Sequence, residues 1–256
     1  MAELKDFNYI EKNLIDIREK INKAVLKRDN IYNKPVRLLA VTKTVDVDRI
    51  NFAISKGVNL IGENKVNELL DKYDKLDKLN KDGLEIHFIG NLQTNKVKYI
   101  IDKVNLIQSV NSLKLAEEIN KRANQNNIIM DVLIEINIGA EDSKIGITPE
   151  SALEFLTVLK DFENIRVKGL MTIPPYIRYI RFEENNMNNT AENGENQEIK
   201  KYFLQMYKIF VDISEKKIDN ITMDTLSMGM SEDYECAILC GADTVRIGRG
   251  IFGERT

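Results

Sequence analysis

The most distinctive chemistry in this sequence belongs to Lys43, which stands two residues after the apolar run 36–41. Partial burial at the end of a strand lowers the pKa of a lysine amine. A neutral amine can attack an aldehyde and form a Schiff base. Because the chain has 37 Lys and Arg residues, this position alone is more typical of an ordinary surface lysine.

Two glycine-containing segments near the C-terminus could bind an anion. Ser227 and Gly229 lie in residues 227–231, and Gly248 lies in residues 246–250 between Arg246 and Arg249. Glycines let backbone N–H groups approach a phosphate closely, and a hydroxyl group or a helix N-terminus strengthens such a site. The alternative is that these are ordinary turn glycines.

Three further positions carry polar or reactive side chains. Asn64 follows the apolar run 58–61 and could donate to a phenolate or carbonyl oxygen, or cap a helix. Cys236 and Cys240 share one face of an expected helix, and we interpret them as small core residues. His87 is the sole histidine, and it falls on an expected strand, where it could line a pocket or lie hydrogen-bonded in the interior. We predict no metal site and no catalytic residue, because no nucleophile motif or ligand set accompanies His87.

The elements that would position these residues are short apolar runs of strand type. Helical patterns lie between them, among them 66–76, 199–213 and helices that begin near 148 and 231, the last ending at Gly241. This alternation favours a parallel sheet, and eight strands favour a single (β/α)8 TIM-type barrel, with a doubly wound open sheet as the alternative. Residues 4–25 predict an extra N-terminal helix. The eight runs are 36–41, 58–61, 84–89, 104–107, 128–138, 167–173, 225–228 and 244–247.

Length and composition fit one barrel domain spanning residues 1–256. Residues 183–197 are rich in Asn and Glu, and we interpret them as a mobile surface insertion after the sixth strand. A net charge of −3 without a concentrated basic face argues against nucleic acid. No apolar run approaches the ~18 residues of a membrane span, and the N-terminus lacks a secretory pattern. We therefore expect a cytoplasmic protein.

In a barrel, these candidate residues would meet at one end. Functional residues collect where strands end, and the loops after strands seven and eight are a recurrent phosphate site. A lysine after strand one facing a phosphate site implies a ligand with both a carbonyl group and a phosphate. Pyridoxal 5'-phosphate (PLP) fits this description, and so does a sugar phosphate in a Schiff-base aldolase.

The chain resembles the pyridoxal phosphate homeostasis proteins (the YggS/PROSC family). Motifs along nearly the whole chain carry the resemblance, and chance would not place so many in the same order. They are Ala-Val-Thr-Lys-Thr (40–44), Gly-Glu-Asn-Lys-Val-Asn-Glu-Leu (62–69), His-Phe-Ile-Gly-Asn-Leu-Gln-Thr-Asn-Lys (87–96), Glu-Asp-Ser-Lys-Ile-Gly-Ile (141–147), Gly-Leu-Met-Thr-Ile (169–173), Leu-Ser-Met-Gly-Met-Ser (226–231), Val-Arg-Ile-Gly (245–248) and Ile-Phe-Gly (251–253).

The resemblance implies a barrel like the N-terminal domain of alanine racemase, with PLP bound to Lys43. It implies that Asn64 lies beside the cofactor ring and that Arg246 faces the pyridine nitrogen. It also implies that the phosphate contacts the four remaining candidates, which are Ser227, Gly229, Gly248 and Arg249. Some relatives carry a small hydroxyl residue in place of Arg249, so its contribution is expected from the backbone N–H group.

An arginine at the pyridine nitrogen has a chemical consequence. Arginine stays protonated in proteins, so Arg246 disfavours a proton on the ring nitrogen and makes the ring a poorer electron sink. The sequence also ends shortly after the eighth strand, without the second β domain of alanine racemase. We therefore expect a monomeric PLP carrier acting in intracellular vitamin B6 homeostasis, with PLP-requiring apoenzymes as partners. The alternative is a PLP-dependent amino-acid racemase.

Overall fold

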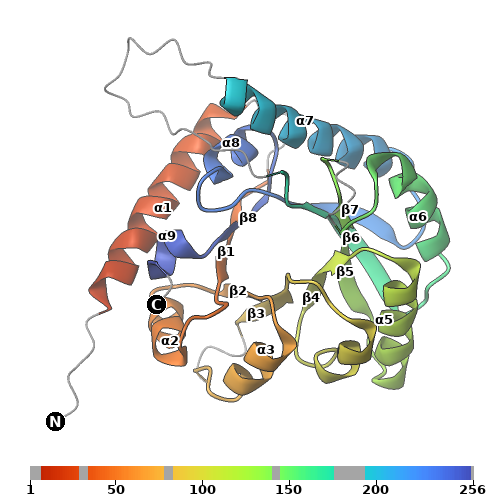
Figure 1. Cartoon of the computed structure of the whole chain (residues 1–256), viewed down its shortest axis with the longest axis horizontal. Helices are drawn as coiled ribbons and strands as arrows, with labels where there is room; N and C mark the ends of the chain where they lie inside the picture. Colours follow the sequence, from red (N-terminus) through yellow and green to blue (C-terminus); the bar gives the residue numbers. More distant parts are fainter. Residues whose placement is uncertain (1–6, 29–33, 78–82, 140–144, 176–193, 255–256) are drawn as a thin grey trace.

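Eight parallel strands close into a barrel in chain order, each hydrogen-bonded to the next, with β8 joined back to β1 (Figure 1). The computed structural model describes residues 7–28, 34–77, 83–139, 145–175 and 194–254. The expected (β/α)8 barrel is confirmed, and the open sheet is excluded. The strands are β1 (Arg37–Val41), β2 (Leu60–Glu63), β3 (Glu85–Phe88), β4 (Leu106–Val110), β5 (Met130–Ile136), β6 (Ile165–Thr172), β7 (Ile221–Ser227) and β8 (Thr244–Ile247).

Helices surround the barrel and bury one face each against it (Figure 1). Among the described residues, none of these helices is long and apolar enough to cross a membrane. The α-helices are α1 (Asn8–Lys27), α2 (Val47–Ser55), α3 (Val66–Tyr73), α5 (Leu113–Gln125), α6 (Ala152–Leu159), α7 (Gly194–Ser214), α8 (Tyr234–Leu239) and α9 (Arg249–Phe252), with short 3₁₀ helices η1 (Thr94–Tyr99) and η2 (Pro149–Ser151).

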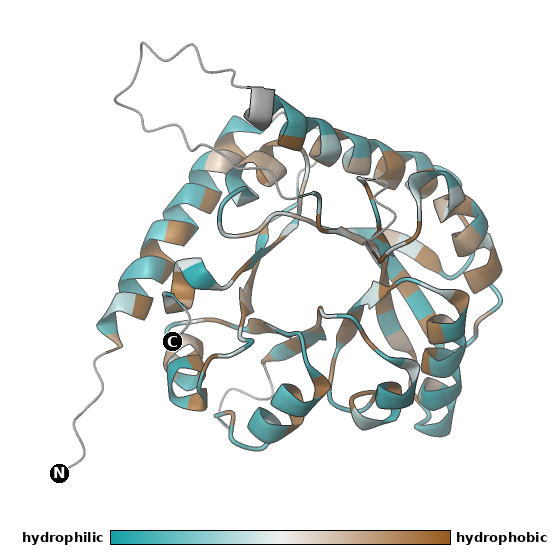
Figure 2. Cartoon of the chain, viewed as in Figure 1, coloured by the Kyte–Doolittle hydropathy of each residue, from teal (hydrophilic) through white to brown (hydrophobic). Residues whose placement is uncertain are grey.

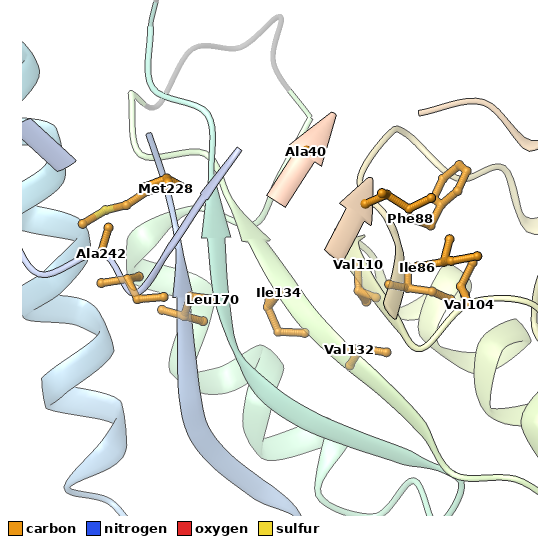
Figure 3. Packing of buried hydrophobic residues seen from close by; sticks show 14 of the residues in the cluster. Ala40, Ile86, Phe88, Val104, Val110, Val132, Ile134, Leu170, Met228 and Ala242 are labelled. Atoms are coloured by element: carbon orange, nitrogen blue, oxygen red, sulfur yellow. The ribbon is translucent and has the colours of Figure 1, made fainter. Parts of the chain in front are cut away.

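Alternation along the strands divides the apolar residues between two layers. Ala40 points outward into the large core between strands and helices, part of which Figure 3 shows. Its neighbours Leu39 and Val41 belong to a small cluster inside the barrel, and a second interior cluster comes from β4, β5 and β6. The strand period of two therefore sends one side chain to the core and the next to the barrel interior. Along the surrounding helices, hydrophobic residues recur with the helical period of 3.6, between hydrophilic ones (Figure 2).

The extra N-terminal helix, α1, lies beside α8 and α9 (Figure 1). The Asn13 side chain donates to the Ile251 carbonyl oxygen at 3.0 Å, and the Tyr9 hydroxyl donates to the Phe252 carbonyl oxygen at 3.4 Å. Leu14 on the buried face of α1 is almost fully covered. The start of the sequence thus supports the helices that follow β7 and β8.

The expected element bounds need small corrections. β4 ends at Val110 and β7 begins at Ile221, so each is shifted or extended by several residues from its apolar run. The helix expected from residue 231 begins only at Tyr234, because the three preceding residues form a turn. Its expected end at Gly241 is confirmed by a φ of 103°, which favours glycine.

The surface insertion expected at 183–197 is divided by the described region. Residues 183–193 lie outside the described residues, so the interpretation is not tested there. Residues 194–197 belong to the first turn of α7, which therefore begins earlier than the Asn- and Glu-rich composition indicated. The two cysteines are buried without a disulfide in and next to α8, as expected of core residues.

Candidate functional site

A cavity of about 430 Å³ opens where β1, β2, β7 and β8 end, and we call it the mouth cavity. This is the end of the barrel at which sites of this fold collect. Its volume lies within the range of about 300–1,000 Å³ that is usual for small-molecule sites. Its walls consist of Val41, Lys43, Asn64, Ile89, Ile173, Pro174, Pro175, Met230, Ser231, Glu232, Asp233, Arg246, Gly248 and Arg249.

Lys43 enters the mouth cavity from a tight turn at the end of β1. The backbone N–H of Val45 donates to the Thr42 carbonyl oxygen at 3.0 Å, which closes the turn. Thr44 adopts a φ of 62°, in the left-handed region, and its N–H donates to the Glu68 carboxylate at 2.7 Å. The carboxylate of α3 thus stabilises a backbone conformation that a β-branched residue rarely adopts. Lys43 is half-buried as a result.

A buried ion pair lies directly behind this turn. The amine of Lys72 is 2.8 Å from the carboxylate of Glu63 and also donates to the Thr42 carbonyl oxygen at 2.8 Å. The Thr42 hydroxyl donates to the same Glu63 carboxylate at 2.7 Å. These contacts join the ends of β1 and β2 to α3, so the backbone that carries Lys43 is fixed from the outer side of the barrel.

Asn64 is held against the next strand by a close backbone approach. A Cβ atom at Gly90 would stand 2.1 Å from the Asn64 carbonyl oxygen, so residue 90 must be glycine for the two segments to pack as they do. The side-chain oxygen of Asn64 is buried and has no hydrogen-bond partner within the described residues. A buried amide without a partner is costly, and in a cavity wall it favours a polar ligand.

Arg246 forms the floor of the mouth cavity and is almost completely buried. Its guanidinium donates to the Ser227 hydroxyl oxygen at 2.7 Å and to the Thr172 carbonyl oxygen at 2.8 Å. Burial lowers the pKa of Arg246 to about 10, while the charges of Asp233 and Glu135 oppose that change. The side chain therefore remains a cation at neutral pH.

The two carboxyl groups near Arg246 are themselves perturbed. Burial raises the pKa of Asp233 and of Glu135, and the charge of Arg246 opposes the rise in both cases. Asp233 lies in the cavity wall and accepts a hydrogen bond from the Met230 backbone N–H. Glu135 accepts one from the Asn111 side chain at 3.3 Å. The cation in the cavity floor thus lies near two carboxyl groups, of which Asp233 lines the cavity.

The segment after β8 approaches the cavity through Gly248 and Arg249, where α9 begins. The first N–H groups of a helix lack partners within that helix, which makes them available to an anion. The guanidinium of Arg249 is turned to the Glu232 carboxylate at 2.6 Å, and a contribution from the Arg249 backbone stays a prediction. A Cβ atom at Gly248 would stand 3.3 Å from the Val41 carbonyl oxygen, so a side chain there would crowd β1.

Two predicted phosphate contacts do not line the mouth cavity. Ser227 is fully buried in the barrel, where its hydroxyl group lies between Arg246 and Gln108. Gly229, with a φ of 91°, packs against α8 so closely that a Cβ atom would lie 2.6 Å from that of Ala237. The structure therefore brings five of the seven predicted residues together in the cavity walls, and it places Ser227 and Gly229 outside them.

Ser231 lines the mouth cavity as well and is not among the residues predicted from the sequence. Its hydroxyl oxygen accepts from the Gly250 backbone N–H at 3.4 Å, which joins the loops after β7 and β8. The signal was present in the segment 227–231, which holds two serines. Ser227 ends a strand, whereas Ser231 lies in the loop, and loop residues form the sites of this fold.

His87 lies inside the barrel and does not line the mouth cavity. Its Nδ1 atom is 2.9 Å from the Gln108 amide nitrogen, and its Nε2 atom is 3.4 Å from the Glu85 carboxylate. Burial lowers the pKa of His87, which keeps the ring neutral. Of the two interpretations considered for His87, the hydrogen-bonded interior residue is the one observed. Within the described residues, no group of three potential metal ligands occurs.

Comparison with known proteins places the chain in a family. The alanine racemase N-terminal domain family matches residues 17–256. The pyridoxal phosphate homeostasis protein of Aquifex aeolicus is 42% identical over 93% of this chain and 95% of its own length. That of Escherichia coli K12 is 35% identical over 97% of each chain. The chain belongs to the pyridoxal phosphate homeostasis proteins, within the alanine racemase N-terminal domain family.

Three solved structures of similar fold have between 30% and 14% sequence identity to this chain. An unknown protein from Bifidobacterium adolescentis has a TM-score of 0.83 and 30% identity, with 98% of both chains covered. The PipY protein of Synechococcus elongatus, solved with PLP bound, has a TM-score of 0.76 and 24% identity over 95% of this chain. Alanine racemase from Corynebacterium glutamicum has a TM-score of 0.65 and 14% identity, and this chain covers 62% of it. The last two show the barrel fold alone.

Proposed function

We propose that this protein binds PLP as a Schiff base on Lys43 and acts in intracellular vitamin B6 homeostasis. The observation that carries the proposal is the convergence of Lys43, Asn64, Arg246 and Gly248 on one cavity at the strand ends. Curated relatives with up to 42% identity are named pyridoxal phosphate homeostasis proteins. PLP is thus the phosphorylated aldehyde that we favour over a sugar phosphate.

The residues of the mouth cavity fit PLP. The aldehyde requires an amine, which Lys43 supplies from the end of β1. The buried Asn64 amide oxygen, without a partner in the described residues, indicates that a polar group belongs beside it. When bound, PLP would supply an electrophilic carbon and a conjugated ring. The chain supplies the amine, the donors and a cavity of sufficient volume.

The phosphate would bind at the loops after β7 and β8. The backbone N–H groups of Gly248 and Arg249 lie at the start of α9, and Ser231 adds a hydroxyl group from the facing loop. We therefore propose Ser231 for the hydroxyl contact that Ser227 was expected to make. Ser227 and Gly229 would act from below, through Arg246 and the packing of α8.

Arg246 favours a carrier over an efficient racemase. A guanidinium can only donate hydrogen bonds, so it would meet a pyridine nitrogen that carries no proton. Arg246 keeps its positive charge at neutral pH because its pKa is about 10. A ring without that proton withdraws electrons weakly, and proton abstraction from a bound amino acid would be slow. We accordingly propose a non-enzymatic holder of PLP.

The remaining expectations follow from this role. A protein that holds PLP for homeostasis would exchange it with PLP-requiring apoenzymes in the cytoplasm. We also propose that residues 1–256 act as one barrel domain, as a monomer.

An absorption spectrum of the purified protein, before and after borohydride, tests the proposal. We expect a visible band from PLP linked to Lys43, its loss in Lys43→Ala, and its retention in Lys65→Ala, because Lys65 is an exposed lysine close to the site. Mass analysis of the reduced adduct separates PLP from a sugar phosphate. A wild-type protein that fails to bind added PLP contradicts the proposal, and rapid racemisation of alanine that depends on Lys43 favours the racemase instead.

A further inference from the structure

A row of hydrogen-bonded side chains crosses the barrel interior and ends on Arg246. We call His87, Gln108, Ser227 and Arg246 the interior polar row; they come from β3, β4, β7 and β8 and are all buried. The Gln108 amide lies 2.9 Å from His87 and 2.7 Å from the Ser227 hydroxyl oxygen. Ser227 in turn lies 2.7 Å from Arg246. A polar row of this kind is unusual in an interior that otherwise holds aliphatic clusters.

The donor and acceptor roles along this row have only one consistent assignment. Arg246 can only donate, so Ser227 accepts from it and gives its own proton to the Gln108 carbonyl oxygen. The Gln108 nitrogen then faces His87, and because an amide nitrogen only donates, the Nδ1 atom of His87 must be unprotonated. The His87 proton lies on Nε2, toward the Glu85 carboxylate at 3.4 Å. If Gln108 were turned the other way, its oxygen would face Nδ1 of His87, and the His87 proton would have to lie on Nδ1. The lone pair of Nε2 would then point at the Glu85 carboxylate, which is unfavourable.

The interior polar row gives the Arg246 guanidinium a fixed hydrogen-bond acceptor, although two carboxyl groups nearby also attract it. The Ser227 hydroxyl can present a lone pair to Arg246 only while its proton is accepted by Gln108. The charges of Asp233 and Glu135 also attract Arg246. Without Gln108, the Ser227 hydroxyl would be free to rotate, and only the Thr172 carbonyl oxygen would hold the guanidinium against the attraction of these carboxyl groups.

We propose that Gln108 is a positioning residue of the cofactor site, which acts through Ser227 to hold the Arg246 guanidinium toward the ring nitrogen of PLP. This inference rests on the function proposed above. His87 anchors the far end of the row, and it orients Gln108 because its Nδ1 atom accepts one amide proton. Ser227, which lies in a family motif but outside the mouth cavity, would thus act through Arg246.

The first test uses the protein without ligand. Nuclear magnetic resonance of the Arg246 guanidinium, assigned by its absence in Arg246→Lys, reports whether its terminal nitrogens are held. We expect separate, slowly exchanging signals in the wild type and averaged signals in Gln108→Met and Ser227→Ala. Gln108→Glu should retain the separate signals, since its carboxylate accepts from Ser227, while it moves a proton onto Nδ1 of His87. The matched control is Ser109→Ala on the same strand, which removes a buried hydroxyl without a partner in the described residues.

The second test measures PLP affinity. Loss of the hydrogen bond from Ser227 to Gln108 predicts up to about ten-fold weaker PLP binding in Gln108→Met, with Ser109→Ala unchanged. Arg246 signals in Gln108→Met and Ser227→Ala that match the wild type overturn the inference whether or not PLP binds. If Gln108→Met does not fold, Ser227→Ala and Gln108→Glu decide it in the same way. A wild type that fails to bind PLP overturns the proposed function. The first test, which needs no ligand, still decides whether Gln108 holds the Arg246 guanidinium in place.

Discussion

At the scale of single residues, burial and hydrogen-bond direction decide what each side chain can do. Arg246 remains a cation because its pKa, although lowered to about 10, stays well above neutral pH. His87 remains neutral because burial outweighs the attraction of Glu85. One residue therefore serves as a permanent donor in the cavity floor, and the other as an acceptor at the far end of the row.

We predict that His87 titrates below its ordinary pKa of 6.5. Burial opposes its protonation, and so does the charge of Arg37 on β1, while Glu85 on its own strand and Asp131 on β5 favour it. Because the sequence has a single histidine, its ring resonances give the midpoint without assignment. A midpoint at or above 6.5 contradicts the neutral role of His87 in the row.

The same shift predicts a pH dependence of stability. The unfolded chain takes up a proton at His87 near pH 6.5, whereas the folded protein does so only at lower pH. The free energy of unfolding therefore falls as the pH drops below 6.5, by up to about 1.4 kcal/mol per pH unit from this group. In denaturant unfolding below pH 6.5, the free energy of unfolding should therefore fall more steeply with decreasing pH in the wild type than in His87→Gln. The difference isolates His87 from Asp243, whose pKa is raised to about 6 by burial and whose contribution has the opposite sign.

At the scale of elements, the ends of β1, β2 and β3 are fixed by contacts that short apolar runs do not reveal. Lys43 depends on a turn held by Glu68 of α3. Asn64 depends on the approach of the segment after β3, which Gly90 permits.

The strands were predicted from their hydrophobic pattern, but α2, α5 and α9 were not named individually. The buried face of α5 includes two alanines, Ala116 and Ala123, which contribute little to such a pattern.

We predict that Gly90→Ala weakens both the fold and PLP binding. The new Cβ atom would meet backbone at 2.1 Å, so the segment carrying Asn64 must shift. Forced overpacking of this kind typically costs about 1–3 kcal/mol. Thermal unfolding and PLP titration measure the two effects. Gly83→Ala is the matched control, because no atom lies within 4 Å of its added Cβ, and equal behaviour of the two variants would contradict the prediction.

At the scale of the whole molecule, the first and last described elements of the chain meet. β8 pairs with β1 to close the barrel, and α1 packs against α8 and α9, the helices that follow β7 and β8. The phosphate end of the proposed site thus rests on a helix that is distant in sequence. Stability of α1 and integrity of the site should therefore change together.

We predict that Leu14→Ala destabilises the protein by about 2–5 kcal/mol, the usual cost of removing a fully buried leucine side chain. Leu14 is only 1% exposed, whereas its neighbour Ile15 is 50% exposed. Ile15→Ala should stay within about 0.5 kcal/mol of the wild type. Denaturant unfolding measures both, and a similar loss in the two variants would show that α1 does not pack as described.

The sequence by itself determined the alternation of eight strands with helices, the place of Lys43 at the first strand end and the family. Hydrophobic periodicity and motifs are local properties, so they can be read without knowing which segments meet. Only the tertiary structure decided that Ser227 supports Arg246 from below and that Ser231 lines the cavity. It also decided that Gln108, 119 residues from Ser227, completes the row. Such contacts join strands that are brought together only when the barrel closes.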